Sequence, residues 1–139
     1  MNRQAAWLIT ALFAGLTGCS SGTPPVEQAA AESDAAAGAR IYRGSCIACH
    51  QVNGAGLQGV YPSLAGSPVV LGDPALLARW VIQGQRPPQM PAGRFPTVMP
   101  KFGWMTPREG AALLTHLRSG FGNSAPPVTP AAVAQALGE

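Results

Sequence analysis

Polar and apolar positions divide the start of the chain into two stretches of opposite character. Residues 5–16 form an apolar run without charge, and residues 20–33 consist of Ser, Gly, Thr, Pro, Ala, Glu and Gln with a single valine. The apolar run is shorter than the roughly 20 residues that a helix needs to cross a bilayer. The polar stretch has no apolar period, which predicts a flexible tether.

Two helices are predicted from the start and stop signals that follow. Asp34 can cap a helix over residues 35–43, because an aspartate accepts hydrogen bonds from the free amides of a first turn. A second helix opens at Asp73-Pro74, where the aspartate caps and the proline fills the first helical position, and it ends at Gly84.

A third helix has the strongest local signals. Thr106 and Glu109 form a capping box with proline between them, and Gly120 ends the helix. A last short helix is predicted over residues 130–137. The third helix carries an apolar stripe made of Leu113, Leu114 and Leu117.

The segments between these helices have the composition of loops. Residues 59–68 and the Pro-rich residues 85–102 are predicted to be irregular, and no segment has the alternation of a strand. With 17 Gly, 14 Pro and 11% charged residues, the chain is short of core-forming material, so a buried prosthetic group would help to stabilise it. The pattern predicts a small all-α domain.

The first 19 residues have the layout of a secretory signal. Arg3 supplies a positive charge before the apolar run, and small residues follow the run. Leu16-Thr17-Gly18-Cys19 resembles a bacterial lipobox, which implies a lipoprotein signal peptide over 1–18, a lipid on Cys19 and a lipidated tether over 19–33. The resemblance implies a lipid anchor on the periplasmic side of a bacterial membrane, and Ser20 favours the outer membrane.

The alternative is an ordinary signal peptide in which Cys19 is incidental. A lone free thiol in an oxidising compartment is a liability, which disfavours that alternative.

The distribution of basic residues argues against a nucleic-acid-binding surface. The formal net charge is +3, and removal of residues 1–18 takes away Arg3 and no acid, which leaves +2. The remaining basic residues are scattered and suit solvated helix faces, with mild steering toward an acidic protein partner. They are Arg40, Arg43, Arg79, Arg86, Arg94, Lys101, Arg108 and Arg118.

The chemistry is carried by Cys46-Ile47-Ala48-Cys49-His50. C-x-x-C-H is the attachment signal for c-type haem. Two thiols at this spacing can add to the two vinyl groups of one porphyrin, and the adjacent histidine can supply a nitrogen to the iron. The motif therefore predicts one covalently bound haem c, held by Cys46, Cys49 and His50.

Two other uses of the cysteines are weaker. A zinc site usually has four protein ligands, and the only further Cys or His residues are Cys19 and His116. A thioredoxin-like dithiol occurs in a strand–helix–strand setting, which this sequence lacks.

A second ligand to the iron must come from a distant part of the chain. The candidates are Met90, Met99, Met105 and His116. Met90 and Met99 are each followed by proline, so the residues alone leave the choice between them open. Met105 precedes a helix cap and His116 lies inside a helix, and both positions favour packing roles.

Residues 34–120 resemble a class I cytochrome c, in which a helix leads into C-x-x-C-H and P-x-L and M-P-x-F motifs follow. The matching residues are Cys46–His50, Pro62-Ser63-Leu64 and Met99-Pro100-Lys101-Phe102. The resemblance implies three or more helices around one haem, a cytochrome domain over 34–122 and a Pro-rich C-terminal extension over 123–139.

The resemblance also implies roles for single residues. Met99 is the distal ligand by this match, although the Met-Pro pair at Met90 leaves an alternative, and the Pro62 carbonyl should accept a hydrogen bond from the His50 ring. Gly38 and Tyr42 match positions where the first helix crosses the last one.

Aromatic side chains are expected to line the haem pocket, and an arginine that the sequence does not identify could pair with the haem propionates. The aromatic candidates are Trp80, Phe102 and Trp104.

His50 and Met99 together would leave no open position on the iron, which predicts one-electron transfer between redox proteins and no small-molecule substrate. The alternatives are a haem-based gas sensor or peroxidase-like enzyme with an open distal site, and a structural lipoprotein with a vestigial haem. Residues 122–130 are similar to the tails of cytochromes that accompany periplasmic dehydrogenases and oxidases; a Pro-rich clamp around the domain is the simpler interpretation.

Overall fold

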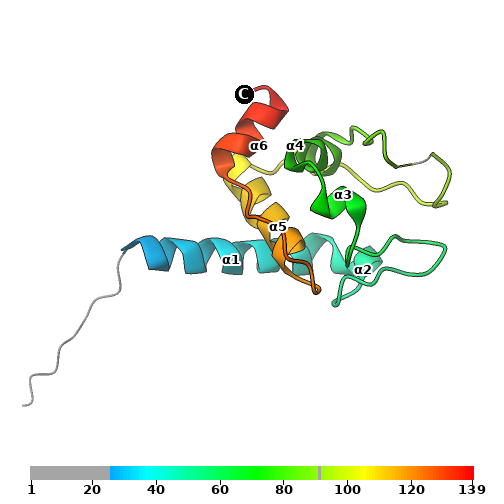
Figure 1. The fold of residues 1–139 in the computed structure, drawn as a ribbon, viewed down its shortest axis with the longest axis horizontal. Helices are drawn as coiled ribbons and strands as arrows, with labels where there is room; N and C mark the ends of the chain where they lie inside the picture. Colours follow the sequence, from blue (N-terminus) through cyan, green and yellow to red (C-terminus); the bar gives the residue numbers. More distant parts are fainter. Residues whose placement is uncertain (1–25, 91) are drawn as a thin grey trace, which may run out of the picture.

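The protein is all-helical over the residues that the computed structural model describes, 26–90 and 92–139 (Figure 1). This part of the chain has no strand and contains only an isolated bridge between Leu57 and Tyr61. None of its helices is long and apolar enough to cross a membrane. The predicted all-α class is confirmed. The elements are α1 (Val26–Ser45), α2 (Ile47–His50), α3 (Pro68–Leu71), α4 (Pro74–Ala78), the π-helical segment η1 (Arg79–Gln83), α5 (Pro107–Ser119) and α6 (Pro130–Leu137).

Helix α1 crosses α5 in direct contact, and Gly38 permits this approach (Figure 1). A Cβ atom at Gly38 would overlap the carbonyl of Ala112 on α5. One turn later, Tyr42 is buried in the same apolar cluster as the leucines of α5. The predicted crossing at Gly38 and Tyr42 is therefore present.

His116 lies beside this crossing as a packing residue. Its ring centroid is 5.4 Å from that of Tyr42 and 5.5 Å from that of Phe121. Burial, aided by the nearby Arg43, lowers the pKa of His116 below its ordinary value. The histidine is therefore neutral at neutral pH, as suits a group between two aromatic rings.

The predicted start of the first helix is wrong. Helix α1 begins at Val26, so Asp34 lies inside it and does not cap it. The residues before Asp34 are rich in Ala, Glu and Gln, which favour a helix even without an apolar stripe. Asp34 instead accepts hydrogen bonds from the Arg108 guanidinium at 2.9 and 3.1 Å. The predicted flexible tether is thus helical from Val26 on, and its earlier part lies outside the described residues.

The other helix signals are confirmed by their hydrogen bonds. The Asp73 carboxylate accepts from the Ala75 amide at 2.8 Å, and the helix that starts there ends at Gly84 in the left-handed conformation. Its second half, η1, is π-helical, and the short helix α3 lies at the end of a predicted loop; neither was expected. The capping box is present, with 2.9 Å from the Thr106 amide to the Glu109 carboxylate.

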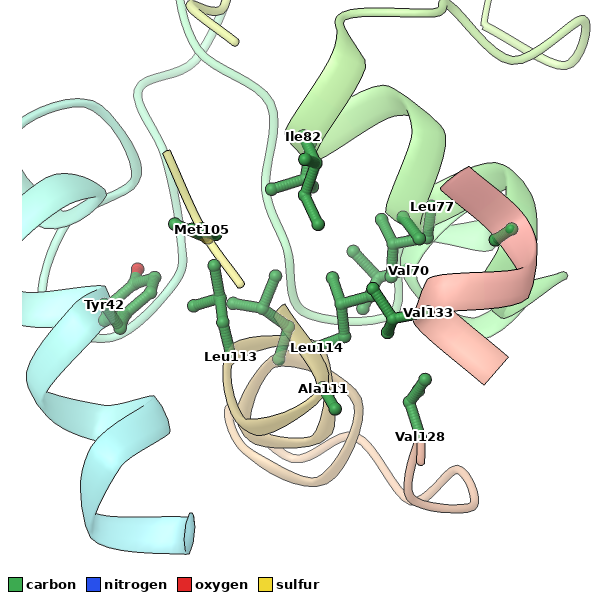
Figure 2. Packing of buried hydrophobic residues seen from close by; sticks show 14 of the residues in the cluster. Tyr42, Val70, Leu77, Ile82, Met105, Ala111, Leu113, Leu114, Val128 and Val133 are labelled. Carbon is green, nitrogen blue, oxygen red and sulfur yellow. The ribbon is translucent and has the colours of Figure 1, made fainter. Parts of the chain in front are cut away.

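The core forms where α5 meets α4, η1 and α6. Leu113 and Leu114 of α5 and Val133 are fully buried, and Figure 2 shows Leu113 on the side of α5 that faces Tyr42 and Met105, with Val133 on the other side. Full burial of such side chains contributes roughly 1.5–3 kcal/mol each. Because Val133 belongs to α6, the C-terminal extension is part of the core.

Polar contacts also fix the extension. The buried guanidinium of Arg118 donates to the carbonyls of Val70 and Gly72 at 2.7 and 2.9 Å and to that of Pro126 at 3.0 Å. At the far end, Gln83 donates to the Leu137 carbonyl at 3.1 Å. The extension therefore wraps the domain, as the clamp interpretation predicts.

Candidate functional site

A hollow lies between the C-x-x-C-H turn and the irregular loop of residues 85–102, which we call the strap. It contains about 720 Å³ of space not filled by atoms, including a part that is open to solvent. An apolar recess adjoins it toward α5. The residues that line both are Cys46, His50, Pro62, Trp80, Met90 and Met99.

The first wall is the turn between α1 and α2. Helix α1 ends at Ser45, and the single turn of α2 brings Cys46, Cys49 and His50 to the hollow. The His50 amide donates to the Cys46 carbonyl at 2.9 Å, which closes this turn. The structure thus brings together the two thiols and the imidazole that the motif singles out.

The His50 ring is held by the carbonyl of Pro62. The distance from Nδ1 to this oxygen is 3.0 Å, so the predicted contact is present. A carbonyl oxygen can only accept, so Nδ1 carries the proton and Nε2 keeps its lone pair. Burial lowers the pKa of His50, against an opposite effect of the bond to Pro62, so the ring is neutral at neutral pH. A neutral imidazole with a free Nε2 is the form that binds a metal.

Gly56 lies against the Pro62 carbonyl, where there is no room for a side chain. Its φ is 67°, and a Cβ atom there would lie 2.5 Å from the Pro62 oxygen. Its amide donates to the His50 carbonyl at 3.0 Å, so one glycine contacts both partners of the ring hydrogen bond. Sequence reasoning missed this residue, because one glycine in a Gly-rich loop carries no signal of such a contact.

The opposite wall is the strap, which supplies two thioethers. Met90 and Met99 are both half-buried and both line the hollow. Met99 also packs against the main apolar cluster, as does Phe102. The strap is irregular throughout its described residues, as expected, and the Phe102 amide ties it to the Val81 carbonyl at 3.0 Å.

The aromatic lining is partly as predicted. Trp80 and Phe102 line the hollow, but the placement of Trp104 in its wall is wrong, because this side chain is 59% exposed and lies outside the lining. Trp104 stands in the turn before α5, where Met105 takes the buried position instead, as expected for a packing residue. Outside a helix or strand, the sequence has no periodic pattern from which the direction of the Trp104 side chain could be predicted.

Arg86 is the arginine that the structure places in the lining of the hollow. Its guanidinium carbon lies 5.3 Å from the centroid of the Trp80 ring, a cation–π distance. The sequence left open which arginine could face the acidic groups of a haem; Arg86 is the candidate by its position, and the pairing stays a prediction.

The chemistry of the thiols disfavours a redox dithiol. Burial, with a contribution from Cys49, raises the pKa of Cys46 to about 11. Redox-active cysteines instead have lowered pKa values.

A zinc centre also lacks ligands in the described part of the chain, where no three His, Cys, Asp or Glu side chains converge on a possible metal position. Two thiols and a neutral imidazole facing two thioethers across an apolar hollow suit an iron porphyrin better than either alternative.

Cys19 and the predicted signal peptide over 1–18 lie outside the described residues. Their roles stay predictions from the sequence.

Comparison with known proteins gives a family match over most of the domain. The family model described as Cytochrome c matches residues 35–121. The chain is 36% identical over 103 residues to the cytochrome c subunit of a quinone alcohol dehydrogenase from Gluconobacter oxydans, a match that covers 73% of this chain and 22% of that subunit.

Two further relatives support the match. The cytochrome c subunit of a gluconate 2-dehydrogenase from Pantoea cypripedii is 33% identical over 95 residues, which cover 66% of this chain and 22% of that subunit. Cytochrome c-552 from Thermus thermophilus is 32% identical over 94 residues, 63% of this chain and 70% of that protein. The chain thus spans about a fifth of the two dehydrogenase subunits and most of the smaller cytochrome.

Proposed function

Because the chain belongs to the cytochrome c family, we propose that His50 and Met99 are the axial ligands of its haem iron and that it carries single electrons between redox proteins of the bacterial periplasm. It is an electron carrier with covalently bound haem c, not a catalyst in its own right. The observation that carries the ligand proposal is the hollow, which has the C-x-x-C-H turn on one wall and methionines on the other.

Each wall offers what a haem needs. Cys46 and Cys49 would hold the porphyrin through thioether bonds, and Nε2 of His50 would bind the iron while Nδ1 stays on the Pro62 carbonyl. Arg86 is placed to pair with a propionate. The apolar walls, Trp80 among them, exclude water. When bound, the haem iron supplies a reversible change between Fe(III) and Fe(II).

Packing favours Met99 over Met90 as the distal ligand. Both thioethers face the hollow, but only Met99 is among the half-buried side chains packed on the main apolar cluster. Its position is fixed further by the bond from the Phe102 amide, three residues later, to the backbone of η1. A ligand whose backbone is anchored in this way loses less conformational freedom when it binds.

A gas sensor or peroxidase-like enzyme would need an open position on the iron, and the two methionines at the strap argue against one. We expect the untreated ferrous protein to bind carbon monoxide slowly or not at all, and to be oxidised and reduced reversibly by one electron. Stopped-flow mixing with carbon monoxide and a spectroelectrochemical titration measure both properties. Rapid, stoichiometric binding of carbon monoxide would contradict the electron-carrier proposal and favour the gas sensor or enzyme.

We also propose that a lipid on Cys19 anchors the carrier to a membrane on the periplasmic side, with the outer membrane slightly favoured. The support is the signal-like pattern of residues 1–19 and the similarity of residues 16–19 to a lipobox. The names of two relatives suggest, as a further proposal, that the redox partner is a periplasmic dehydrogenase.

Cell fractionation of the wild type and a Cys19→Ala variant tests both proposals together. The wild type is expected in the membrane fraction, with an oxidoreductase that co-purifies after detergent extraction, and the variant in the soluble fraction. A wild-type protein that is fully soluble would refute the anchor, and membranes from which no oxidoreductase co-purifies would count against a stable partner.

A further inference from the structure

A buried asparagine joins the C-terminal extension to the loop that supports His50. The Asn123 side chain is 8% exposed, and it lies just beyond the end of α5. Its Oδ1 accepts from the Gly66 amide at 2.8 Å, and its Nδ2 donates to the carbonyls of Leu64 at 3.1 Å and Leu117 at 2.8 Å. The side-chain amide therefore has three partners, two of them on a loop almost 60 residues earlier in the chain.

The third side-chain contact and one backbone bond fix Asn123 to the end of α5. Leu117 belongs to this helix, and the Asn123 amide donates to the Gly120 carbonyl at 2.9 Å. Helix α5 has more buried residues than any other described helix, so Asn123 is anchored to a well-packed element. Its side chain therefore gives Leu64 and Gly66 a fixed hydrogen-bond partner.

The loop held by Asn123 is the one that supplies the Pro62 carbonyl. Leu64 and Gly66 lie two and four residues after Pro62, and the Leu64 amide donates to the Gly54 carbonyl at 2.7 Å. The loop is thus fixed on one side by the segment after His50 and on the other by Asn123. Hydrogen bonds thus connect α5 to Asn123 and Asn123 to Leu64 and Gly66, the backbone connects Leu64 to Pro62, and the Pro62 carbonyl bonds to the His50 ring.

We propose that Asn123 is a positioning residue for the proximal ligand: it holds the loop so that the Pro62 carbonyl keeps its hydrogen bond to His50 Nδ1. This inference rests on the proposed function, in which His50 binds the haem iron. A well-aligned hydrogen bond from Nδ1 to the Pro62 carbonyl makes Nε2 a stronger electron-pair donor to the iron. A stronger donor favours Fe(III), an effect of the kind that outer hydrogen-bond partners have on metal-bound histidines. Loss of Asn123 loosens the bond and shifts the equilibrium toward Fe(II).

The test compares Asn123→Ala with Thr115→Val in the holoprotein. The Thr115 hydroxyl donates to the Val128 carbonyl at 3.3 Å and accepts from the Val128 amide at 2.9 Å, so its loss weakens the same extension without touching residues 62–66. Two readouts are measured besides thermal stability. They are hydrogen exchange of the His50 ring N–H, followed by NMR in the ferrous state, and the reduction potential.

Asn123→Ala is expected to speed exchange of the ring N–H by tenfold or more and to raise the Fe(II)/Fe(III) ratio severalfold at a fixed applied potential, where tenfold corresponds to about 59 mV. Thr115→Val is expected to lower stability while leaving both readouts at the wild-type values. If Asn123→Ala does not fold, Asn123→Ser, which keeps a polar group, is expected to change both readouts in the same direction by less.

Two results would overturn the proposal: unchanged exchange and potential in the Asn123 variant, or equal changes in both variants in proportion to lost stability. Failure of the proposed function has a different signature, because the wild type itself would then lack a His50 ring N–H signal shifted by the haem.

Discussion

A variant with Cys46 and Cys49 both replaced by alanine is expected to carry no haem through denaturation and to lose most of its stable fold. The hollow is walled by side chains that face each other across open space, and among the bonds of the strap's described residues are those from the Thr97 hydroxyl to the Val60 carbonyl and from the Phe102 amide to the Val81 carbonyl, each 3.0 Å. A domain of this size has a free energy of unfolding of only about 5–15 kcal/mol. Without a covalently held haem, the apolar walls of the hollow would stay in contact with water, and the missing burial is expected to remove a large part of this free energy.

Haem staining after denaturing electrophoresis and far-UV circular dichroism measure the two effects. The single variants Cys46→Ala and Cys49→Ala are the matched controls, and each is expected to keep one thioether bond and an intermediate stability. A double variant with wild-type helicity and thermal stability would contradict the prediction.

Replacement of Met99 by alanine is expected to abolish the weak sulfur-to-iron charge-transfer band of the oxidised protein in the red. It is also expected to lower the reduction potential by on the order of 0.1 V, a part of the ~0.8 V range that axial ligands cover. A thioether stabilises Fe(II), and its loss leaves a position that water or carbon monoxide can take.

Met90→Ala is the matched control, since this residue comes from the same strap, lines the same hollow and also precedes a proline. The control is expected to keep the band and a potential close to that of the wild type. Loss of the band in Met90→Ala and its persistence in Met99→Ala would identify Met90, not Met99, as the distal ligand.

Features encoded by neighbouring residues could be predicted from the sequence. The caps at Asp73 and Thr106 depend on side chains next to the amides that they satisfy, and the structure has both. The C-x-x-C-H motif likewise carries its chemistry within five residues. The predicted start of α1 was wrong because it relied on the capping preference of Asp34 alone. In the structure, Asp34 accepts a hydrogen bond from Arg108, which is 74 residues away.

Features that depend on contacts between distant segments could not be predicted. Gly56 lies against the Pro62 carbonyl, and Asn123 bonds to Leu64 and Gly66 of the same loop, yet neither belongs to a motif. The prediction grouped Trp104 with Trp80 and Phe102 in the wall of the hollow, but Trp104 lies in the turn of residues 103–104 and is exposed. The choice of Arg86 among the scattered basic residues likewise needed the path of the strap.

The C-terminal extension, residues 123–139, contacts both the core and the loop that carries Pro62. Its apolar residue Val133 completes the core, and Arg118 and Asn123 connect it to the segments on either side of α3. A truncation after α5 would therefore disturb the loop that carries the Pro62 carbonyl and would remove α6.

The most direct test of the central claim is the mass of the mature protein and of its peptide that contains Cys46 and Cys49, after production in a host that can attach c-type haem. The account predicts that the peptide is heavier than its bare sequence by the mass of one haem, that the protein carries the same increment beside any lipid on Cys19, and that this haem resists acid–organic extraction. A peptide with two free thiols, in a protein without a Soret band, would contradict it.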